Sequence, residues 1–258
     1  MSQDWPRRAF LGLGAAAAGG VALGTQLGAA AAEQAAKHSV VVWSEGTAPK
    51  NVYPNDINGA IAEGLAKLEG WDVVKANLSD AEQGLPDDLL QRTDVLIWWG
   101  HQRHGQVKNE LVEKIVRRVK EDGMGFISLH SSHFAKPNRK LMGTGCGWKA
   151  YVGDSTTLKI IVKEPTHPIA EGIKEFTITH NERYSDPYGV PEPKAVVFEG
   201  TATLRNGQTD TSRQGFCWEI GKGRMFYFQP GHETNPVFFD ENVRKILANA
   251  VKWAAPQR

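Results

Sequence analysis

Apolar segments and amphipathic segments alternate along the chain from residue 38 to about residue 130. The segment SVVVW (39–43) is an apolar run of the kind that is buried on both faces of a parallel sheet. Residues 55–68 and 111–119 carry apolar side chains at helical spacing, and Gly123 is a typical residue for ending the second helix. Further strands are predicted at WDVVKAN (71–77), DVLIWWG (94–100) and MGFISLH (124–130). This alternation predicts an α/β domain with a parallel sheet.

The second half of the chain has a different pattern. Separate extended segments are predicted at STTLKIIVKE (155–164), EFTITHNERYS (175–185) and KAVVFEG (194–200). The segment 214–231 predicts a hairpin that turns at Gly221–Gly223, and a last helix is predicted over Asp240–Ala254. We therefore expect one domain over residues 38–256: a mostly parallel sheet with helices on both faces and antiparallel additions in the C-terminal half.

Residues 1–32 have the features of an export signal. Arg7 and Arg8, followed by Ala-Phe-Leu, match the twin-arginine pattern, although Pro6 stands where that pattern usually has Ser or Thr. The Ala- and Gly-rich stretch behind them is too weakly apolar for a stable membrane span. We expect a twin-arginine signal peptide that is cleaved within residues 30–36, transport by the twin-arginine machinery and a periplasmic location. The alternative is an uncleaved amphiphilic anchor.

Charge and cysteine content narrow the possible functions. The net charge is +1, and residues 1–32 carry Asp4, Arg7 and Arg8, so the chain without them has zero net charge. No basic patch for nucleic acid is indicated. Cys146 and Cys217 are too far apart in sequence to indicate a disulfide framework, and whether they pair is left open. No Gly-x-Gly-x-x-Gly motif follows a strand, so no nucleotide cofactor is expected.

Histidines follow two of the predicted strands in pairs with the same spacing. The first pair is His101 and His104, and the second is His130 and His133. In an open parallel sheet the ligand crevice lies at the carboxyl ends of the strands, where the strand order reverses. If the order is flavodoxin-like, these histidines and Glu45 converge there. Similar side chains occur later in the chain, at His180, Glu182, Asp186, His232 and Glu233. Histidine and carboxylate ligands suit zinc, and the same set suits manganese, iron or nickel.

The motifs VLIWWGHQRH, GMGFISLHSSHFAKPNRKLMGT, HPIAEGI, ERYSDPYGVPEP and GRMFYFQPGHETNP occur in this order between about Val40 and Pro256. Together they resemble the trehalose-utilisation (ThuA-like) family. The resemblance implies a class I glutamine amidotransferase-like, flavodoxin-like fold. An amidotransferase presents a cysteine in a Gly-x-Cys-x-Gly turn, whereas this chain has LHSSH, with Ser131 nearest the nucleophile position. Glutamine hydrolysis is therefore not expected.

The resemblance also implies a role in the catabolism of trehalose-type disaccharides through 3-keto sugars, alongside a separate sugar dehydrogenase. Our hypothesis is a metal-assisted elimination, hydration, isomerisation or hydrolysis of a 3-keto sugar or keto-glycoside, which makes the chain a lyase, isomerase or hydrolase. One alternative is a non-catalytic periplasmic module that binds a sugar or a partner protein. Another is a serine hydrolase that uses Ser131, His232 and Glu233. The sequence leaves open whether the chain forms a homo-oligomer.

This hypothesis assigns roles to eleven residues. A divalent metal, zinc or manganese, is expected on a subset of the four paired histidines, with Glu182 and His232 as the acid/base pair. The metal candidates are His101, His104, His130 and His133; the catalytic candidates are His130, Glu182, His232 and Glu233; the substrate-binding candidates are Glu45, Trp98, Trp99 and Trp148.

The export prediction can be tested by replacing both Arg7 and Arg8 with Lys. Export should fail, because the twin-arginine route recognises the paired guanidinium groups and not the charge alone. Cell fractionation and immunoblotting should then show full-length precursor in the cytoplasm. Lys37→Arg, just beyond the expected signal, is the matched control and should leave export unchanged. If the double variant is cleaved and found in the periplasm at the wild-type level, the prediction is contradicted.

Overall fold

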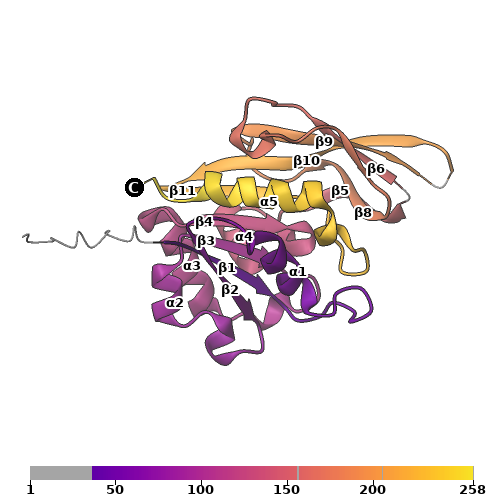
Figure 1. Cartoon of the computed structure of the whole chain (residues 1–258). Coiled ribbons are helices and arrows are strands. Elements are labelled where there is room, and N and C mark those ends of the chain that lie inside the picture. The colour runs from indigo at the N-terminus through magenta and orange to yellow at the C-terminus, as the bar shows by residue number, and fades with distance from the viewer. Residues whose placement is uncertain (1–36, 156, 205, 258) are drawn as a thin grey trace, which may run out of the picture. The chain divides into compact units, whose positions relative to one another are not determined.

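Nine strands of the described chain form one sheet, in the order β2–β1–β3–β4–β11–β10–β9–β6–β7 (Figure 1). Strands β2, β1, β3, β4 and β11 pair parallel with one another, and β11 pairs antiparallel with β10 on its other side. This part of the order is flavodoxin-like, with the reversal between β1 and β3. The predicted fold class is confirmed. The parallel strands are β1 (His38–Ser44), β2 (Trp71–Asn77), β3 (Val95–Trp99), β4 (Gly125–Leu129) and β11 (Gly223–Phe228).

The structure, a computed structural model, describes residues 37–257 except 156 and 205, without the side chains of residues 152–155. These described residues form one compact unit. The predicted signal peptide and its cleavage region lie outside the described residues. None of the helices in the described part is long and apolar enough to cross a membrane. Both cysteines are buried free thiols.

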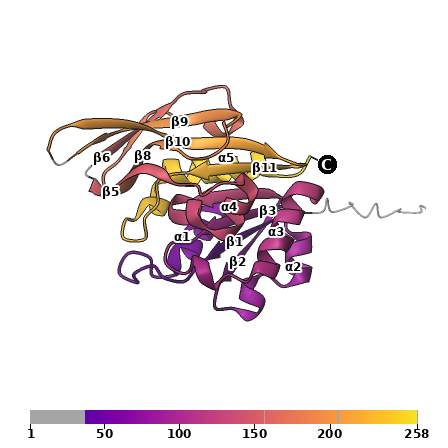
Figure 2. The ribbon, with the colours of Figure 1, turned by 180° about the vertical axis from the view of Figure 1, so that it is seen from behind.

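Apolar side chains of the parallel strands pack against helices on both faces of the sheet. Val40 and Val42 belong to one buried cluster, and Val41 and Trp43 belong to another, because successive strand residues point to opposite faces. The first cluster includes residues of α1 (Asp56–Leu65) and α5 (Glu241–Ala254). The second includes α2 (Asp87–Arg92), α3 (Asn109–Asp122) and α4 (Lys136–Met142), which Figure 2 shows from behind.

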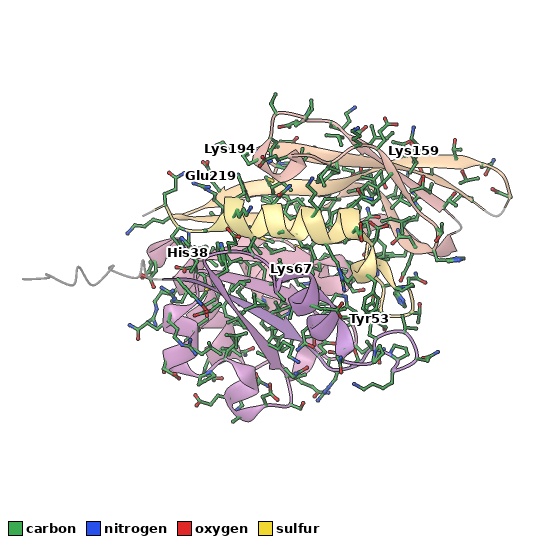
Figure 3. All side chains as sticks on the ribbon, viewed as in Figure 1. His38, Tyr53, Lys67, Lys159, Lys194 and Glu219 are labelled. Carbon is green, nitrogen blue, oxygen red and sulfur yellow. The ribbon has the colours of Figure 1, made fainter. Side chains whose placement is uncertain are left out.

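The C-terminal half adds antiparallel strands to the sheet, as predicted. The hairpin of β10 and β11 closes with Ile220 opposite Gly223, and Lys194 and Glu219 form an ion pair at this end of β9 and β10 (Figure 3). Strands β5 (Trp148–Ser155) and β8 (Asn181–Tyr188) form a separate two-stranded ribbon. The antiparallel strands are β6 (Thr157–Val162), β7 (Phe176–Ile178), β9 (Ala195–Thr203) and β10 (Thr209–Ile220).

Two local signals explain where the long helices begin and end. Gly123 follows α3 with φ +82°, a left-handed conformation that favours glycine, and its N–H donates to the carbonyl of Arg118. Asp240 caps α5, because its carboxylate accepts the N–H groups of Asn242 and Val243. Both ends agree with the sequence prediction to within one residue. Helices α2 and α4, and the strand β5, were not predicted.

Candidate functional site

The turn after β4 begins with a histidine in a left-handed backbone conformation. His130 follows Leu129 with φ +49° and is fully buried. A strained strand-to-helix turn of this kind presents the nucleophile in the comparable elbow of hydrolases. The left-handed position of this turn is occupied by His130, and Ser131 is the residue after it. The Ser131 hydroxyl is 3% exposed and lies 3.1 Å from the Tyr184 hydroxyl, whereas a serine triad would pair it with His232.

Hydrogen bonding fixes how the His130 ring is oriented. Its Nδ1 lies 2.7 Å from the carbonyl oxygen of Gln229, so Nδ1 carries the proton and donates. The lone pair of the neutral ring is then on Nε2. This nitrogen lies 2.9 Å from the Tyr184 hydroxyl and 3.4 Å from the Glu182 carboxylate. A carbonyl that binds the far nitrogen of a histidine is the usual support of a metal ligand.

Glu182 and His232 complete a group of three with His130. The Glu182 carboxylate lies 3.0 Å from Nε2 of His232, and the candidate ligand atoms of the three residues lie within 4.8 Å of one another. Nδ1 of His232 lies 2.8 Å from the Thr234 hydroxyl. Burial would raise the pKa of Glu182, but the neighbouring His130 and His232 outweigh it and lower that pKa. Burial and the charge of His130 lower the pKa of His232. An ionised carboxylate thus faces the His232 imidazole, whose neutral form is favoured.

His101 and Glu233 form a hydrogen-bonded pair beside this group. Nδ1 of His101 lies 2.7 Å from the Glu233 carboxylate, and the same oxygen accepts the Gln102 side-chain amide at 2.9 Å. Burial would raise the pKa of Glu233, but these hydrogen bonds hold it at about 2. The hydrogen bond to Glu233 raises the pKa of His101. The His101 side chain is 37% exposed and that of Glu233 only 4%, so the imidazole faces the solvent side of the pair. His101, His232 and Glu233 make a second group with ligand atoms within 4.8 Å of one another.

Glu45 anchors the loop that carries His101. One oxygen of its buried carboxylate accepts the backbone N–H groups of residues 101, 102 and 103, at 2.9, 2.8 and 2.9 Å. A Cβ on Gly100 would lie 2.8 Å from the other oxygen, so glycine is needed for the loop to approach the carboxylate. Glu45 is fully buried, and its carboxylate accepts hydrogen bonds from the backbone of the loop. The prediction that it binds substrate is therefore not supported, and its role is to position the loop.

His104 and His133 belong to neither group among the described residues. Nδ1 of His133 lies 3.0 Å from the His130 carbonyl, and burial lowers the pKa of His133 to about 3. Nδ1 of His104 lies 3.5 Å from Glu45, and burial lowers its pKa. The predicted set of metal histidines is thus divided. His101 and His130 join the polar cluster with Glu182, His232 and Glu233, and the other two histidines lie behind it.

The three tryptophans predicted to stack on a sugar are core residues. Trp98 and Trp99 are fully buried, and Trp98 stacks on Trp43 with ring centroids 3.7 Å apart. Trp148 is 6% exposed and stacks on Tyr188 at 4.2 Å. The prediction is wrong for Trp98 and Trp99, because alternating strand residues of a doubly covered sheet are buried on both faces. Trp148 supports the ribbon of β5 and β8 from inside.

Two tyrosines near the cluster were not predicted. Tyr184 stands two residues after Glu182 on β8, so the period of a strand places both side chains on one face. This spacing was available in the sequence. Tyr151 is 46% exposed, and its ring lies 5.1 Å from Tyr184 and 5.9 Å from His133. Its position depends on the pairing of β5 with β8, which the sequence did not indicate. Asp186, another candidate, forms an ion pair with Arg213 at 2.7 Å.

Residues 39–254 match the ThuA family, whose description is trehalose utilisation. The chain belongs to the ThuA family. No protein with a curated description matches the sequence. A role of this ThuA-family chain in carbohydrate utilisation follows from the family at this coarse level.

Several solved structures are similar to this ThuA-family chain. A ThuA-like protein from Bacteroides uniformis is 18% identical, with 85% of this chain and 92% of that chain covered and a TM-score of 0.58. A cytoplasmic protein from Salmonella typhimurium is 16% identical, with coverages of 84% and 99% and a TM-score of 0.59. A glutamine amidotransferase from Thermotoga maritima is 12% identical, with coverages of 84% and 97% and a TM-score of 0.53. These similarities confirm the glutamine amidotransferase-like fold and show the fold alone.

The role of Glu45 can be tested by comparing Glu45→Ala with Glu45→Gln. The alanine leaves three partly buried backbone N–H groups without their carboxylate acceptor and should lower the free energy of unfolding by roughly 3 kcal/mol. The glutamine keeps an acceptor oxygen and should cost about 1 kcal/mol. Urea unfolding measures both changes, and hydrogen exchange should show lost protection at residues 101–103 in Glu45→Ala. Equal stability of the two variants would contradict an anchoring role.

Proposed function

We propose that this chain is an enzyme of carbohydrate utilisation that performs a metal-assisted acid/base step on a 3-keto sugar or keto-glycoside. The step is an elimination, hydration, isomerisation or hydrolysis. The observation that carries the proposal is the cluster of His130, Glu182 and His232, whose ligand atoms lie within 4.8 Å of one another at the carboxyl ends of the parallel strands. Membership of the ThuA family supports a carbohydrate substrate, and the cluster supports metal-assisted acid/base chemistry.

The donor set fits a divalent ion. Two histidines and one carboxylate leave coordination positions open, as in catalytic zinc sites and other divalent metal sites. The His130 ring is held by the Gln229 carbonyl with Nε2 toward Glu182, which is the orientation that a ligand needs. This assignment keeps His130 from the predicted ligands and replaces the other three with Glu182 and His232. Zinc and manganese both suit this set.

His101 and Glu233 support the acid/base step. Glu233 binds Nδ1 of His101 and leaves Nε2 free to exchange a proton with substrate, as the orienting carboxylate does in a catalytic triad. The hydrogen bond also stabilises the protonated ring, so His101 can hold the proton that it removes. His101 therefore takes the proton-transfer role that we predicted for Glu182 and His232.

The chemistry of a keto sugar explains why both parts of the cluster are needed. A ketone acidifies the C–H groups on the neighbouring carbons, so a positioned base can remove one of these protons. His101 is the base, and Glu233 keeps its ring in place. A divalent ion, when bound, supplies polarisation of an oxygen on which negative charge develops. The Tyr184 hydroxyl, 2.9 Å from His130, offers a hydrogen bond at the same position.

The location and partners belong to the same proposal. The Arg7–Arg8 motif supports export by the twin-arginine machinery, which carries proteins that are already folded. A separate sugar dehydrogenase would supply the ketone, because the chain has no Gly-x-Gly-x-x-Gly motif for a dinucleotide.

The metal site is tested by metal analysis of exported protein that has been purified without chelator. About one zinc or manganese ion per chain is expected, and Glu182→Gln should weaken its retention at least about tenfold because a charged ligand is lost. Glu175→Gln is the matched control, since Glu175 is an exposed carboxylate paired with Lys159. Wild-type protein without metal, or equal retention in the two variants, would contradict the assignment.

The proton-transfer role is tested with His101→Ala and 3-keto-glucosides as substrates. Turnover, followed as loss of the ketone, should fall by about 10²–10⁴-fold while the metal content stays at the wild-type level. Ser131→Ala should keep activity within a few-fold of wild type. Loss of activity in Ser131→Ala with full activity in His101→Ala would favour the serine hydrolase. Wild-type protein with neither metal nor turnover would favour the binding module.

A further inference from the structure

A groove of about 320 Å³ lies beside the strand ends and takes no part in the cluster described above. One wall is the segment Thr177–His180, which leaves β7. The other wall comes from Pro236, Val237, Phe239 and Asp240, around the 3₁₀ turn η5 (Val237–Phe239). The volume is within the range of small-molecule sites.

Both walls continue directly from the segments that carry the cluster. His180 is two residues before Glu182, so their Cα atoms are at most about 7 Å apart. On the other wall, Pro236 directly follows Asn235, whose N–H donates to the His232 carbonyl at 3.0 Å. The groove therefore lies next to Glu182 and His232, within reach of a molecule that also occupies the cluster.

The second wall is held rigidly in place. The buried Tyr53, labelled in Figure 3, donates its hydroxyl to the Asn235 carbonyl at 2.6 Å and accepts the Phe238 N–H at 3.3 Å. Its ring also stacks on Phe239 with centroids 5.3 Å apart. The Arg244 guanidinium lies 5.5 Å from the Phe239 ring. A surface that is held in advance loses little entropy when a ligand binds.

The lining has the mixed chemistry that a sugar ring needs. Phe239 remains 37% exposed, although the ring is bulky and apolar. Within the described part of the chain, Phe239 and Tyr151 are the large apolar side chains that are exposed, and Tyr151 lies near the cluster. The opposite wall of the groove offers the hydroxyl-bearing Thr177 and Thr179 and the imidazole of His180. An exposed aromatic ring and several polar side chains thus line one groove of small-molecule size.

We propose that this groove is a subsite for the second ring of a glycoside whose keto ring lies at the cluster of His130, Glu182 and His232. The inference rests on the proposed function. The C–H face of the second ring lies on the exposed part of Phe239, and its hydroxyls bond to Thr177, Thr179 and His180. The subsite makes a two-ring substrate bind more tightly than a single ring with a small aglycone.

The test uses sugars without a ketone, so that binding is measured apart from the reaction. Trehalose and methyl α-glucoside are titrated into the metal-retaining exported protein by calorimetry. Wild type should bind trehalose about tenfold more tightly than methyl α-glucoside. Phe239→Ala should bring the two affinities to within about twofold of each other. Phe239→Tyr keeps the ring and should keep the preference, which makes it the matched control.

Three results would overturn the subsite: equal wild-type affinities for the two sugars, a preference that survives in Phe239→Ala, and no binding of either sugar in the millimolar range. A change of oligomeric state in Phe239→Ala with an unchanged sugar preference would also overturn it and assign the face to a protein interface. The reaction is judged separately. Loss of the preference in Phe239→Ala without turnover of any keto sugar by wild type leaves the subsite standing and removes the proposed reaction.

Discussion

The buried carboxylate of Glu45 is the interaction on which the polar cluster depends. One oxygen of this carboxylate accepts three successive backbone N–H groups, and these hydrogen bonds join the end of β1 to the loop after β3. These two strands border the reversal of strand order, where a crevice opens in folds of this type. Without this acceptor, the backbone that carries His101 would lose three of the hydrogen bonds that hold it near Glu233. A buried carboxylate therefore positions the backbone of the loop that carries His101.

Much of the fold was predictable because its signals are local. Continuous apolar strands, helical spacing and a glycine after α3 each depend on a few neighbouring residues, and all are present in the structure. The convergence of His101, His130 and His232 was predictable for a related reason. The carboxyl ends of parallel strands share one edge, so residues directly after them meet once the strand order is known.

The division of roles within the site was not predictable, because it depends on side-chain direction. His130 and His133 are three residues apart, yet one faces Glu182 and the other lies among aromatic rings with its Nδ1 on a backbone carbonyl. The turn after β4 begins with a left-handed residue, and no periodic pattern reports that change of direction. Trp98 and Trp99 show a second reason why side-chain roles were not predictable. Aromatic residues at a strand end look available for a ligand, but the layers on both faces of the sheet bury them.

The ribbon of β5 and β8 gives the cluster two sources of support. His101, His130 and Glu233 follow strands of the main sheet, whereas Glu182 and Tyr184 stand on the ribbon. Two strands alone have little stability of their own. The ribbon is held to the sheet by an aromatic stack in which Trp148 lies on Tyr188, and Tyr188 lies 5.3 Å from Tyr227 of β11. The packing of Trp148 and Tyr188 against the main sheet therefore helps to keep the Glu182 carboxylate beside its two imidazoles.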